Sequence, residues 1–490
     1  MKDLVLAIDQ GTTGTTAVLM DVHSRVVAAK NVEFPNYFPS PGRVEHDPVE
    51  IWGSVAQAVS GALASVGAHP SRIAAIGITN QRETSLFWDR KTGTAPHRAL
   101  VWQDRRTAPR CEALKAAGWE GRVRARTGLV LDPYFSGTKA EWLLENVAGV
   151  REGATDGSLL YGTIDSFLVW KLCGVHVTDP SNASRTLLFD LHTLAWEDEL
   201  CALFGVPKRC LPTVVDNAGI MGHTHGVGFL PDGIPVAGIA GDQQSALFGQ
   251  ACFDPGMAKC TYGTGAFVLL NTGETPVASG HGLLTTVGWR IDGRTTYALE
   301  GSAFIAGAAV QWLRDGLGFF QSSAEVESLA ASVPDAGGVS FVPALAGLGA
   351  PHWRPDARGL LCGLTRGTTR AHIARAVLEG VALQITDILD AMAQDAGRPL
   401  KELRVDGGAA RNDLLMQFQA DVLGVDCVRP TLLETTAMGA AYLAGLGVGF
   451  WASPAAVRDA WACDRVFHPG MPAGDVSQRR AVWADAVRKA

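Results

Sequence analysis

Two short turns rich in glycine and threonine are the first segments of this sequence that could do chemistry. The first, Asp9–Thr16, follows the apolar run Leu4–Ile8 and reads Asp-Gln-Gly-Thr-Thr-Gly-Thr-Thr. Glycine lets the backbone approach an anion, and successive N–H groups and threonine hydroxyls can donate to phosphate oxygens. Asp9 could hold a Mg²⁺ ion that bridges those oxygens. An ordinary tight hairpin is the alternative, and the four threonines favour phosphate contact over it.

A second turn of the same kind, Thr261–Ala266, lies about 250 residues later and also leads into an apolar run. A repeat would give each half of the chain one phosphate-facing hairpin. Such turns are common, however, so these residues alone slightly favour two unrelated turns. The usual nucleotide signatures GxxxxGK[ST], GxGxxG and paired HRD and DFG are missing from the sequence, so a phosphate would be handled without a P-loop lysine.

Asp242 directly follows the predicted strand Val236–Gly241 and precedes a predicted helix. Its carboxylate could accept a proton from a substrate hydroxyl, because a helix N-terminus keeps a carboxylate ionised. The alternative is that Asp242 is only the N-cap of that helix, and these residues alone favour the cap.

The segment Asn80–Thr84 is dense in hydrogen-bonding groups and follows another apolar strand. An Arg82 donor beside a Glu83 acceptor would suit a polyhydroxyl molecule, because each hydroxyl both donates and accepts. Adjacent opposite charges are more often a solvated surface pair. Trp102 and Tyr134 are aromatic residues of a kind found more often in cores than in ligand walls.

Later in the chain, Arg404–Asn412 reads as a strand, a double-glycine turn and the start of a helix. Such a turn could admit a flat ring near the backbone, or it could be a plain tight connection. The uncharged stretch Thr435–Val457 contains four glycines and Pro454, so we expect a buried helix ending at Gly445 rather than a membrane span.

The composition excludes several classes of protein. With 49 acidic and 42 basic residues the net charge is -7, which argues against a nucleic-acid binder. The chain is 47% hydrophobic and 19% charged, so it is not globally disordered. Nine cysteines are spread along the chain without CxxC spacing, so we expect free thiols and a reducing, cytoplasmic setting.

Strand and helix signals alternate along the chain, which predicts an α/β protein. Leu4–Ile8 and Ala17–Met20 predict a hairpin, and Asp47 with Pro48 predicts a helix N-terminus. Gly249–Gly256 is the expected domain boundary because Asp-Pro-Gly within it is a turn signal. The length of 490 residues fits two large domains, which we expect to pack around a cleft.

Taken in order, these segments closely resemble the FGGY carbohydrate kinases, nearly from end to end. Any one turn is weak support, whereas all of them in the same order are strong. The segments that carry the resemblance are Asp9–Thr13, Val44–Pro48, Ile76–Thr84, Asp132–Lys139, Ile239–Gln244, Thr261–Gly265 and Arg404–Gly408. The resemblance implies two actin-like ATPase (ribonuclease H-like) domains that close on an interdomain cleft. Residues 1–250 would bind the polyol and supply the catalytic base, and residues 251–490 would mainly bind the adenine nucleotide.

The Asn-Gln-Arg-Glu-Thr segment at 80–84 separates the members that phosphorylate glycerol from their sugar-phosphorylating relatives. The resemblance therefore implies ATP-dependent phosphorylation of glycerol to sn-glycerol 3-phosphate, with ATP and Mg²⁺ as cofactors. It also implies a homodimer or homotetramer. Asp242 would be the general base, and Asp9 would lie near the metal. The implied glycerol-binding residues are Arg82, Glu83, Trp102, Tyr134, Asp242, Gln243 and Phe267, and the implied nucleotide-binding residues are Thr12, Thr13, Gly14, Thr16, Thr264, Gly307, Gln311, Gly408 and Asn412.

Thr16 departs from the family pattern. The family often carries an arginine at this position, where it is expected to reach the terminal phosphates. A neutral threonine cannot supply that charge, so a weaker grip on the nucleotide is expected.

Three other functions fit the same sequence less well. The same chemistry could act on another short polyol or ketose, such as erythritol or dihydroxyacetone. The fold could serve a non-catalytic, nucleotide-responsive binding protein, but such a protein has no need for Asp242 as a base. An actin-like filament former would have no use for Arg82 and Glu83 in a polar pocket.

Overall fold

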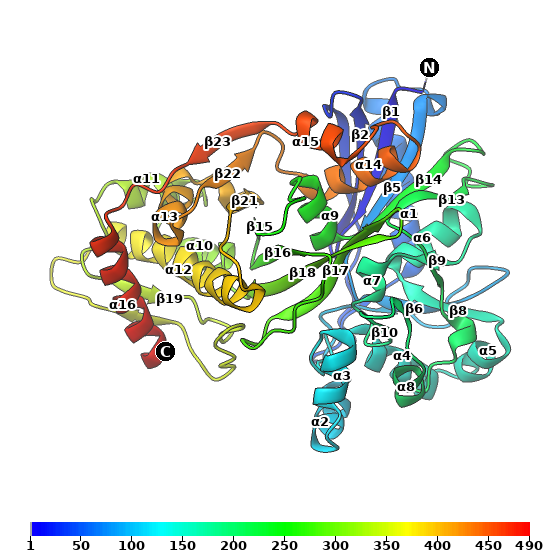
Figure 1. Ribbon diagram of the computed structural model, residues 1–490, viewed down its shortest axis with the longest axis horizontal. Helices are drawn as coiled ribbons and strands as arrows, with labels where there is room; N and C mark the ends of the chain where they lie inside the picture. Colours follow the sequence, from blue (N-terminus) through cyan, green and yellow to red (C-terminus); the bar gives the residue numbers. More distant parts are fainter. Residues whose placement is uncertain (1) are drawn as a thin grey trace.

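The computed structural model describes residues 2–490 and shows two lobes, each built around one large β-sheet (Figure 1). The N-terminal sheet has the strand order β13-β14-β5-β1-β2-β3. The C-terminal sheet has the order β17-β18-β16-β15-β21-β22-β23. The N-terminal strands are β1 (Leu4–Gln10), β2 (Gly14–Asp21), β3 (Val26–Glu33), β5 (Ile73–Asn80), β13 (Ala218–His223) and β14 (Pro235–Gly241). The C-terminal strands are β15 (Met257–Tyr262), β16 (Ala266–Gly273), β17 (Leu284–Ile291), β18 (Arg294–Ala303), β21 (Glu402–Asp406), β22 (Cys427–Pro430) and β23 (Cys463–Phe467).

The two sheets share one arrangement. In each, a glycine–threonine turn joins two antiparallel strands, β1–β2 and β15–β16, and the first strand of each pair also has a parallel neighbour, β5 or β21. A fourth strand, β14 or β22, pairs parallel to that neighbour. The repeat that the two turns alone left in doubt is therefore present in the structure. Each lobe presents an equivalent turn at the carboxyl end of its first strand.

Smaller sheets and helices surround these two. A four-stranded sheet with the order β4-β7-β6-β8 extends the N-terminal lobe, and three two-stranded sheets lie outside the main ones. These strands are β4 (Glu45–His46), β6 (Ser85–Asp89), β7 (Ala99–Leu100), β8 (Leu159–Thr163), β9 (Val177–Thr178), β10 (Phe189–Asp190), β11 (Ala195–Trp196), β12 (Thr213–Val214), β19 (Ser340–Val342) and β20 (Leu360–Cys362). The helices are α1 (Pro48–Ser65), α2 (Ala108–Ala116), α3 (Glu120–Thr127), α4 (Ser136–Asn146), α5 (Val150–Asp156), α6 (Ile164–Cys173), α7 (Pro180–Ala183), α8 (Asp198–Leu203), α9 (Asp242–Gly249), α10 (Gly307–Gln311), α11 (Glu325–Ala331), α12 (Arg370–Ala396), α13 (Asp413–Leu423), α14 (Thr435–Gly447), α15 (Pro454–Ala460) and α16 (Ala473–Lys489).

The predicted elements mostly form. The hairpin is present, and Asp47 caps α1 by accepting a hydrogen bond from the backbone N–H of Val49. The uncharged stretch forms the buried helix α14, which ends two residues beyond the predicted Gly445. No helix within residues 2–490 combines the length and apolar character that crossing a membrane requires. All nine cysteines, which lie within the same residues, are free thiols, as predicted.

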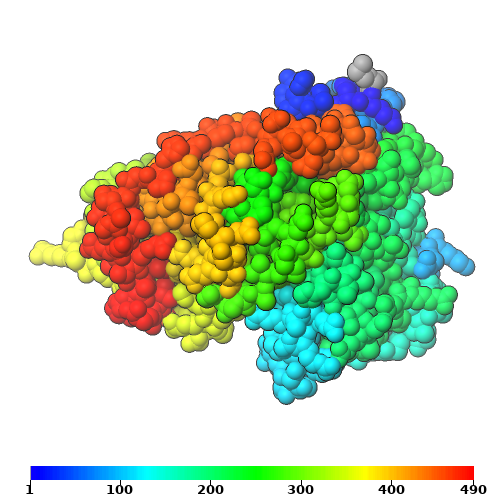
Figure 2. Space-filling view, viewed as in Figure 1, coloured from blue at the N-terminus to red at the C-terminus, as the bar shows by residue number. Residues whose placement is uncertain are grey.

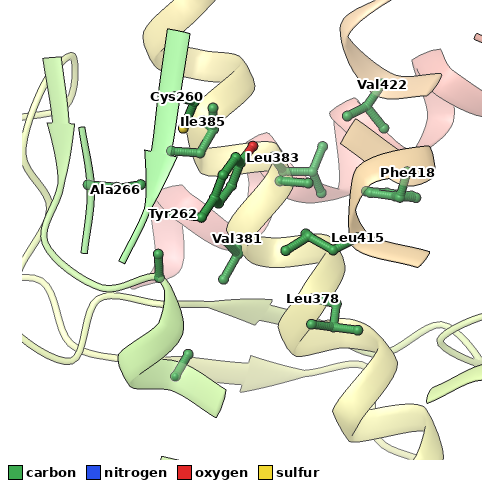
Figure 3. Close-up of a cluster of buried hydrophobic side chains, with 14 of the residues drawn as sticks. Cys260, Tyr262, Ala266, Leu378, Val381, Leu383, Ile385, Leu415, Phe418 and Val422 are labelled. Atoms are coloured by element: carbon green, nitrogen blue, oxygen red, sulfur yellow. The ribbon is translucent and has the colours of Figure 1, made fainter. Parts of the chain in front are cut away.

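The C-terminal lobe has its core between its sheet and the long helix α12. Figure 3 shows Val381 and Ile385 of α12 beside Tyr262 of β15, with Leu415 of α13 nearby. The buried hydroxyl of Tyr262 donates to Gln419 Oε1 at 2.8 Å, which satisfies the one polar group that this ring brings into the core.

Helices α9 (Asp242–Gly249) and α14 (Thr435–Gly447) lie between the two main sheets, and each packs against the sheet of the opposite lobe. Helix α9, from the N-terminal half of the chain, packs against β15, β16 and β17 of the C-terminal sheet. Helix α14, from the C-terminal half, packs against β1, β5 and β14 of the N-terminal sheet, and the two helices pack against each other. Figure 2 shows this late segment reaching across the top of the molecule to the N-terminal strands. The face of each sheet that points toward the other lobe is therefore covered by a helix from the other half of the chain.

Glycines allow these layers to approach closely. A Cβ on Gly77 would lie 2.0 Å from the carbonyl oxygen of Ala440 in α14, and a Cβ on Gly439 would lie 1.8 Å from the carbonyl oxygen of Ser245 in α9. Both distances are well inside van der Waals contact with backbone atoms, which cannot move aside as a flexible side chain can.

Replacing Gly439 with alanine should therefore destabilise the protein. We expect Gly439→Ala to lower the free energy of unfolding by roughly 1–3 kcal/mol or more, because the added methyl must push α9 and α14 apart. Gly53→Ala is the matched control, since Gly53 is also a helical glycine and its added Cβ would meet no heavy atom within 4 Å. That change should be neutral or add up to about 1 kcal/mol through helix propensity. Urea denaturation of the three proteins measures both effects, and equal midpoints for Gly439→Ala and wild type would contradict the packing argument.

Candidate active site

Polar residues from three segments meet at one edge of the N-terminal sheet. Strands β1, β5 and β14 run parallel, and their register places Gln10 opposite Asn80 and Asn80 opposite Gly241. The carboxyl ends of all three strands therefore open at the same edge, which is where open α/β sheets bind ligands. The segment after β5 and the helix α9 after β14 both start from this edge.

Arg82 lies at the centre of this edge and is only 3% exposed. Its Nε is 3.1 Å from Asp242 Oδ1. Its Nη2 donates to the Tyr134 hydroxyl at 3.4 Å, and its Nη1 donates to Gln244 Oε1 at 3.2 Å. Because Arg82 and Glu83 are both buried, the surface-pair alternative is wrong. One guanidinium instead joins two of the other residues predicted to bind a polyol, Tyr134 and Asp242.

Glu83 is held in place by contacts at both its backbone and its side chain. It adopts a left-handed backbone conformation with a φ of 61°, which is uncommon for a residue other than glycine. Its carbonyl accepts from the Ser136 hydroxyl at 2.9 Å, and its carboxylate accepts from Arg185 Nε at 2.7 Å. Burial raises the pKa of Glu83, and the charges of Arg185 and Arg82 partly offset that rise. The carboxylate is therefore kept beside Arg82 by a second arginine.

Two aromatic rings stand beside this polar group. Trp102 and Tyr134 meet edge to face, with ring centroids 5.6 Å apart. The Trp102 Nε1–H donates to the Thr12 hydroxyl at 2.9 Å, which ties the ring to the first glycine–threonine turn. Both residues are partly buried, and Tyr134 also packs against a hydrophobic core cluster of the N-terminal lobe, so the rings border the core as well as the polar group. They form a wall between the polar group and the turn.

Asp242 is the first residue of α9 and not its cap. Gly241 occupies the N-cap position, and its N–H donates to the Ser181 hydroxyl at 3.0 Å. The Asp242 carboxylate accepts from the backbone N–H of Gln243 at 2.7 Å and is 31% exposed. The cap interpretation is therefore wrong, because a glycine with extended backbone can end the strand and leave the acid one position further on. Asp242 thus keeps a carboxylate oxygen accessible at a helix N-terminus.

Asp9 and Asp242 form a pair of acids near the same edge. Burial raises the pKa of Asp9 to about 7, and the charge of Asp242 adds to the rise. No arginine or lysine contributes to lowering it. Two carboxylates without a cation between them suit a hard divalent ion such as Mg²⁺, which takes one or two carboxylates and keeps several waters. Within residues 2–490 there is no cluster of three or more metal-ligating side chains, so any such site would be of this open kind.

Both turns are closed by their own backbone. The Gly11 N–H donates to the Gly14 carbonyl at 2.9 Å, and the Gly263 N–H donates to the Gly265 carbonyl at 2.8 Å. Thr13 and Thr264 at their tips are exposed and Thr12 is partly exposed, which leaves these residues accessible to an anion. The next residues along the first hairpin are less open. A Cβ on Gly14 would lie 2.9 Å from the Val32 carbonyl oxygen, and the Thr16 hydroxyl accepts from Asn31 Nδ2 at 2.9 Å.

Several of the residues predicted to bind the nucleotide lie around the second turn. The Gly307 N–H, at the start of α10, donates to the Gly263 carbonyl at 2.9 Å. Gly407 precedes Gly408 with a φ of 86°, and a Cβ on Gly407 would lie 2.5 Å from the Tyr262 carbonyl oxygen. Glycines therefore allow three segments to pack closely together: the second turn, the start of α10 and the double-glycine turn.

Four predicted residues are less directly connected to this group. Gln311 is exposed at the end of α10. Asn412 is the N-cap of α13, where its Oδ1 accepts from the Leu415 N–H at 2.9 Å. Phe267 is partly buried on β16, between Thr261 and Ser302 on the neighbouring strands. Gln243 is bound from the opposite lobe, because the buried amine of Lys259 on β15 donates to its Oε1.

Glu300, Arg185 and Lys259 were not predicted from the sequence. Glu300 accepts hydrogen bonds from both Arg82 and Arg185, and all three side chains are buried. A signal was present, because a lone carboxylate in the apolar run Tyr297–Gly301 can be buried only with a partner. The sequence does not identify that partner.

Two surface cavities, of about 270 and 460 Å³, lie elsewhere and are lined by none of the residues predicted for chemistry.

Comparisons with known proteins match this arrangement. The model for the FGGY family of carbohydrate kinases, N-terminal domain, matches residues 4–249, and the corresponding C-terminal domain model matches residues 258–448. The chain is 58% identical to a glycerol kinase of Myxococcus xanthus (strain DK1622) over 490 residues, which is 99% of each chain. It is 56% identical to a glycerol kinase of Symbiobacterium thermophilum over 491 residues, which is 100% of this chain and 98% of the relative.

Among solved structures, Plasmodium falciparum glycerol kinase with ADP aligns with a TM-score of 0.94 at 37% identity. The alignment covers 99% of this chain and 98% of that chain. A ligand-bound xylulose kinase from Lactobacillus acidophilus aligns with a TM-score of 0.89 at 21% identity, over 99% of this chain and 97% of that chain. At that identity the second likeness shows the fold alone.

The raised pKa of Asp9 gives a stability prediction with a definite sign. The folded protein holds this proton up to about pH 7, whereas the unfolded chain releases it near the ordinary value of 3.8. The free energy of unfolding therefore falls as pH rises between those values, by at most roughly 1.4 kcal/mol per pH unit from this group. Asp9→Asn removes the titration, so we expect the variant to gain stability relative to wild type between pH 5 and pH 8. Urea midpoints in EDTA measure the difference, and a gap that does not change with pH would contradict the assignment.

Proposed function

This chain belongs to the FGGY family of carbohydrate kinases, and from that premise we propose that it transfers the γ-phosphoryl group of ATP to glycerol. The product would be sn-glycerol 3-phosphate. The relatives at 55–58% identity over nearly the whole chain carry the name glycerol kinase. One structural observation supports the proposal above the others: Arg82, Glu83, Tyr134 and Asp242 come from distant parts of the chain and meet at one sheet edge.

The polar groups at this edge suit a short polyol. Arg82 and the Tyr134 hydroxyl can donate to glycerol oxygens, while Glu83 and Asp242 can accept from its hydroxyls. The Trp102 ring offers an apolar surface to the carbon chain, as does Phe267 on β16. Gln243 would add an amide contact, held from the opposite lobe by Lys259. A site lined by these groups would favour three carbons, because each further carbon must find room among buried charged groups.

Asp242 would act as the general base. As a terminal hydroxyl oxygen of glycerol attacks the γ-phosphorus, its proton moves to the Asp242 carboxylate. The bond between the γ-phosphorus and the β–γ bridging oxygen breaks, and ADP leaves with that oxygen. Arg82 Nε lies 3.1 Å from Asp242 Oδ1, so the carboxylate is oriented before the substrate arrives.

The phosphates would lie between the two turns. N–H groups and hydroxyls of Thr12, Thr13 and Thr264, with the backbone of Gly14, would donate to their oxygens. The adenosine would lie against the C-terminal lobe, near Gly307, Gln311, Gly408 and Asn412. Asp9, with water, would hold Mg²⁺, which supplies charge neutralisation to the γ-phosphate when bound. The base and all proposed polyol residues except Phe267 thus belong to the N-terminal half, and the adenosine contacts belong to residues 251–490.

Closure of the two lobes would complete this site. Expulsion of water by closure would strengthen the polar contacts and limit transfer of the phosphoryl group to water.

Thr16 would contact the terminal phosphates only through its hydroxyl, which already accepts from Asn31. The resemblance to the family further predicts a homodimer or homotetramer, which light scattering on the purified protein tests. The cysteine pattern predicts a cytoplasmic setting.

The first experiment is ADP release measured by a coupled assay with MgATP, with and without glycerol. We expect turnover that depends on glycerol and a kcat/KM for glycerol above that for erythritol or dihydroxyacetone. Turnover with a longer polyol in preference to glycerol would reassign the substrate. Tight glycerol binding by calorimetry without turnover would mean that the protein is a binding protein.

Asp242→Asn tests the base. We expect kcat to fall by roughly 10²–10⁴, with glycerol binding by calorimetry nearly unchanged, because the amide keeps the shape but cannot accept the proton. Asp254→Asn is a control that makes the same chemical change at a half-exposed carboxylate paired with Arg458 near the lobe boundary, and it should keep full turnover. Near-normal kcat in Asp242→Asn would remove Asp242 from the reaction.

A further inference from the structure

Four charged side chains from both lobes form a closed, buried cluster beside the polyol residues. They are Arg82, Glu83, Arg185 and Glu300, and each side chain is at most 3% exposed. Glu300 lies on β18 of the C-terminal sheet, whereas the other three belong to the N-terminal lobe. We call this set the interlobe ion cluster.

Glu300 binds both arginines of the cluster. Its Oε1 accepts from Arg82 Nη2 at 2.9 Å and from Arg185 Nη2 at 3.0 Å. Its Oε2 accepts from Arg82 Nη1 at 2.5 Å, so the carboxylate and the guanidinium of Arg82 meet with two parallel bonds. This forked pairing fixes the plane of the guanidinium as well as its position. Arg185 closes the set by donating from Nε to Glu83 at 2.7 Å.

The cluster is neutral as a whole when both of its glutamates are ionised. It contains two arginines and two glutamates, which satisfies the rule that buried charges need partners. Burial raises the pKa of Glu300, but the charges of Arg185 and Arg82 outweigh it and hold that pKa at about 2. Glu300 is therefore ionised throughout the pH range in which the protein would work, and its hold on Arg82 does not depend on pH.

With both of its Nη atoms bound to Glu300, Arg82 turns the Nε edge of its guanidinium toward Asp242. Its Nε lies 3.1 Å from Asp242, and Nη2 also reaches the Tyr134 hydroxyl at 3.4 Å. Without the forked contact from β18, Arg82 could turn its Nη atoms onto Asp242 and form a tighter pair with the proposed base. Glu300 thus sets which atoms of Arg82 face the polyol.

We propose that Glu300 and Arg185 are positioning residues for the polyol, which hold Arg82 in its binding orientation from the opposite lobe. This inference rests on the proposed function, because it assumes that Arg82 contacts glycerol. Neither Glu300 nor Arg185 touches the substrate. The polyol site of the N-terminal lobe is then complete only when β18 of the C-terminal lobe is in place.

Strand β18 also leads to the second glycine–threonine turn. Glu300 pairs with Leu269 on β16, and the strand ends three residues later with Ala303 opposite Ala266, next to that turn. The Ala306 N–H then donates to the Thr264 carbonyl at 2.9 Å. The residue that orients Arg82 and the turn proposed for the phosphates are therefore carried by one hydrogen-bonded pair of strands, which links the geometry of the two substrate sites.

Glu300→Gln tests the proposal by keeping the size of the side chain and removing its charge. A neutral amide keeps one acceptor oxygen but turns an NH₂ donor toward the arginines, so the forked pairing should be lost and Arg82 should lose its orientation. We expect the KM for glycerol to rise roughly 10- to 100-fold, the size of effect that follows from weakening a charged hydrogen bond, while the KM for ATP stays within about 3-fold of wild type. Glu300→Asp keeps the charge and should recover part of the glycerol affinity.

Glu379→Gln is the matched control. Glu379 is also a buried carboxylate of the C-terminal lobe between two arginines, accepting from Arg375 at 2.9 Å and from Arg479 at 2.8 Å. It lies on α12 and contacts none of the residues proposed for the site. We expect both glutamine variants to lower the thermal midpoint, but only Glu300→Gln should raise the KM for glycerol. A purely structural role for Glu300 would make the two variants behave alike.

A glycerol KM for Glu300→Gln within about 2-fold of wild type would overturn the proposal. If that variant does not fold, Arg185→Lys answers the same question, because lysine keeps the charge but loses the fork that holds Glu300 and Glu83 together. An unchanged glycerol KM in Arg185→Lys would then overturn it. Failure of the proposed function looks different, since the wild-type protein itself would show no glycerol-dependent ADP release.

Discussion

The arrangement of this protein depends on one buried positive charge. Arg82 lies at the junction of the two lobes with 3% of its surface exposed, and a guanidinium cannot lose its proton to escape the cost of burial. It must therefore be surrounded by carboxylates, and the structure supplies them from α9, from the neighbouring residue and from the opposite sheet. Each of these acids in turn needs a fixed place. The requirement to neutralise one side chain thus joins segments that are distant in the sequence.

The duplicated sheet provides those fixed places. Because β1, β5 and β14 run parallel, the ends of three strands deliver Asp9, Arg82 and Asp242 to one edge. The equivalent strands of the second sheet bring the Gly263 and Gly407 turns together in the same way. The exchange of α9 and α14 between the lobes then locks the two sheets to each other. Close glycine contacts hold these helices and sheets at fixed distances. The small residues between the two sheets thereby support the geometry of the charged side chains at the sheet edge.

Local features of the chain were predictable, whereas contacts between distant segments were not. The two glycine–threonine turns, the helix after Pro48 and the buried helix α14 follow from patterns within a few residues. The position of Asp242 was harder to predict. An N-cap residue and the first residue of a helix differ by one position, and here Gly241 takes the N-cap position. Glu300 was missed because its partner Arg82 is 218 residues away. A buried charge can be recognised in a sequence, but its partner depends on how the sheets pack.

The charges around the proposed site are balanced at its polyol end but not around Asp9, and Thr16 lies beside Asp9. At the polyol end, the interlobe ion cluster balances its own charges inside the protein. At the phosphate end, Asp9 and Asp242 are left without a shared cation, and the pKa of Asp9 rises to about 7. Thr16 lies directly opposite Asp9 in the antiparallel pair, so its side chain is on the same face of the sheet. An arginine there, as the family often has, would stand beside that acid and hold its pKa down. With threonine in its place, the proposed divalent cation would have to neutralise both Asp9 and the phosphates, so we expect the proposed affinity for nucleotide to depend more strongly on that ion.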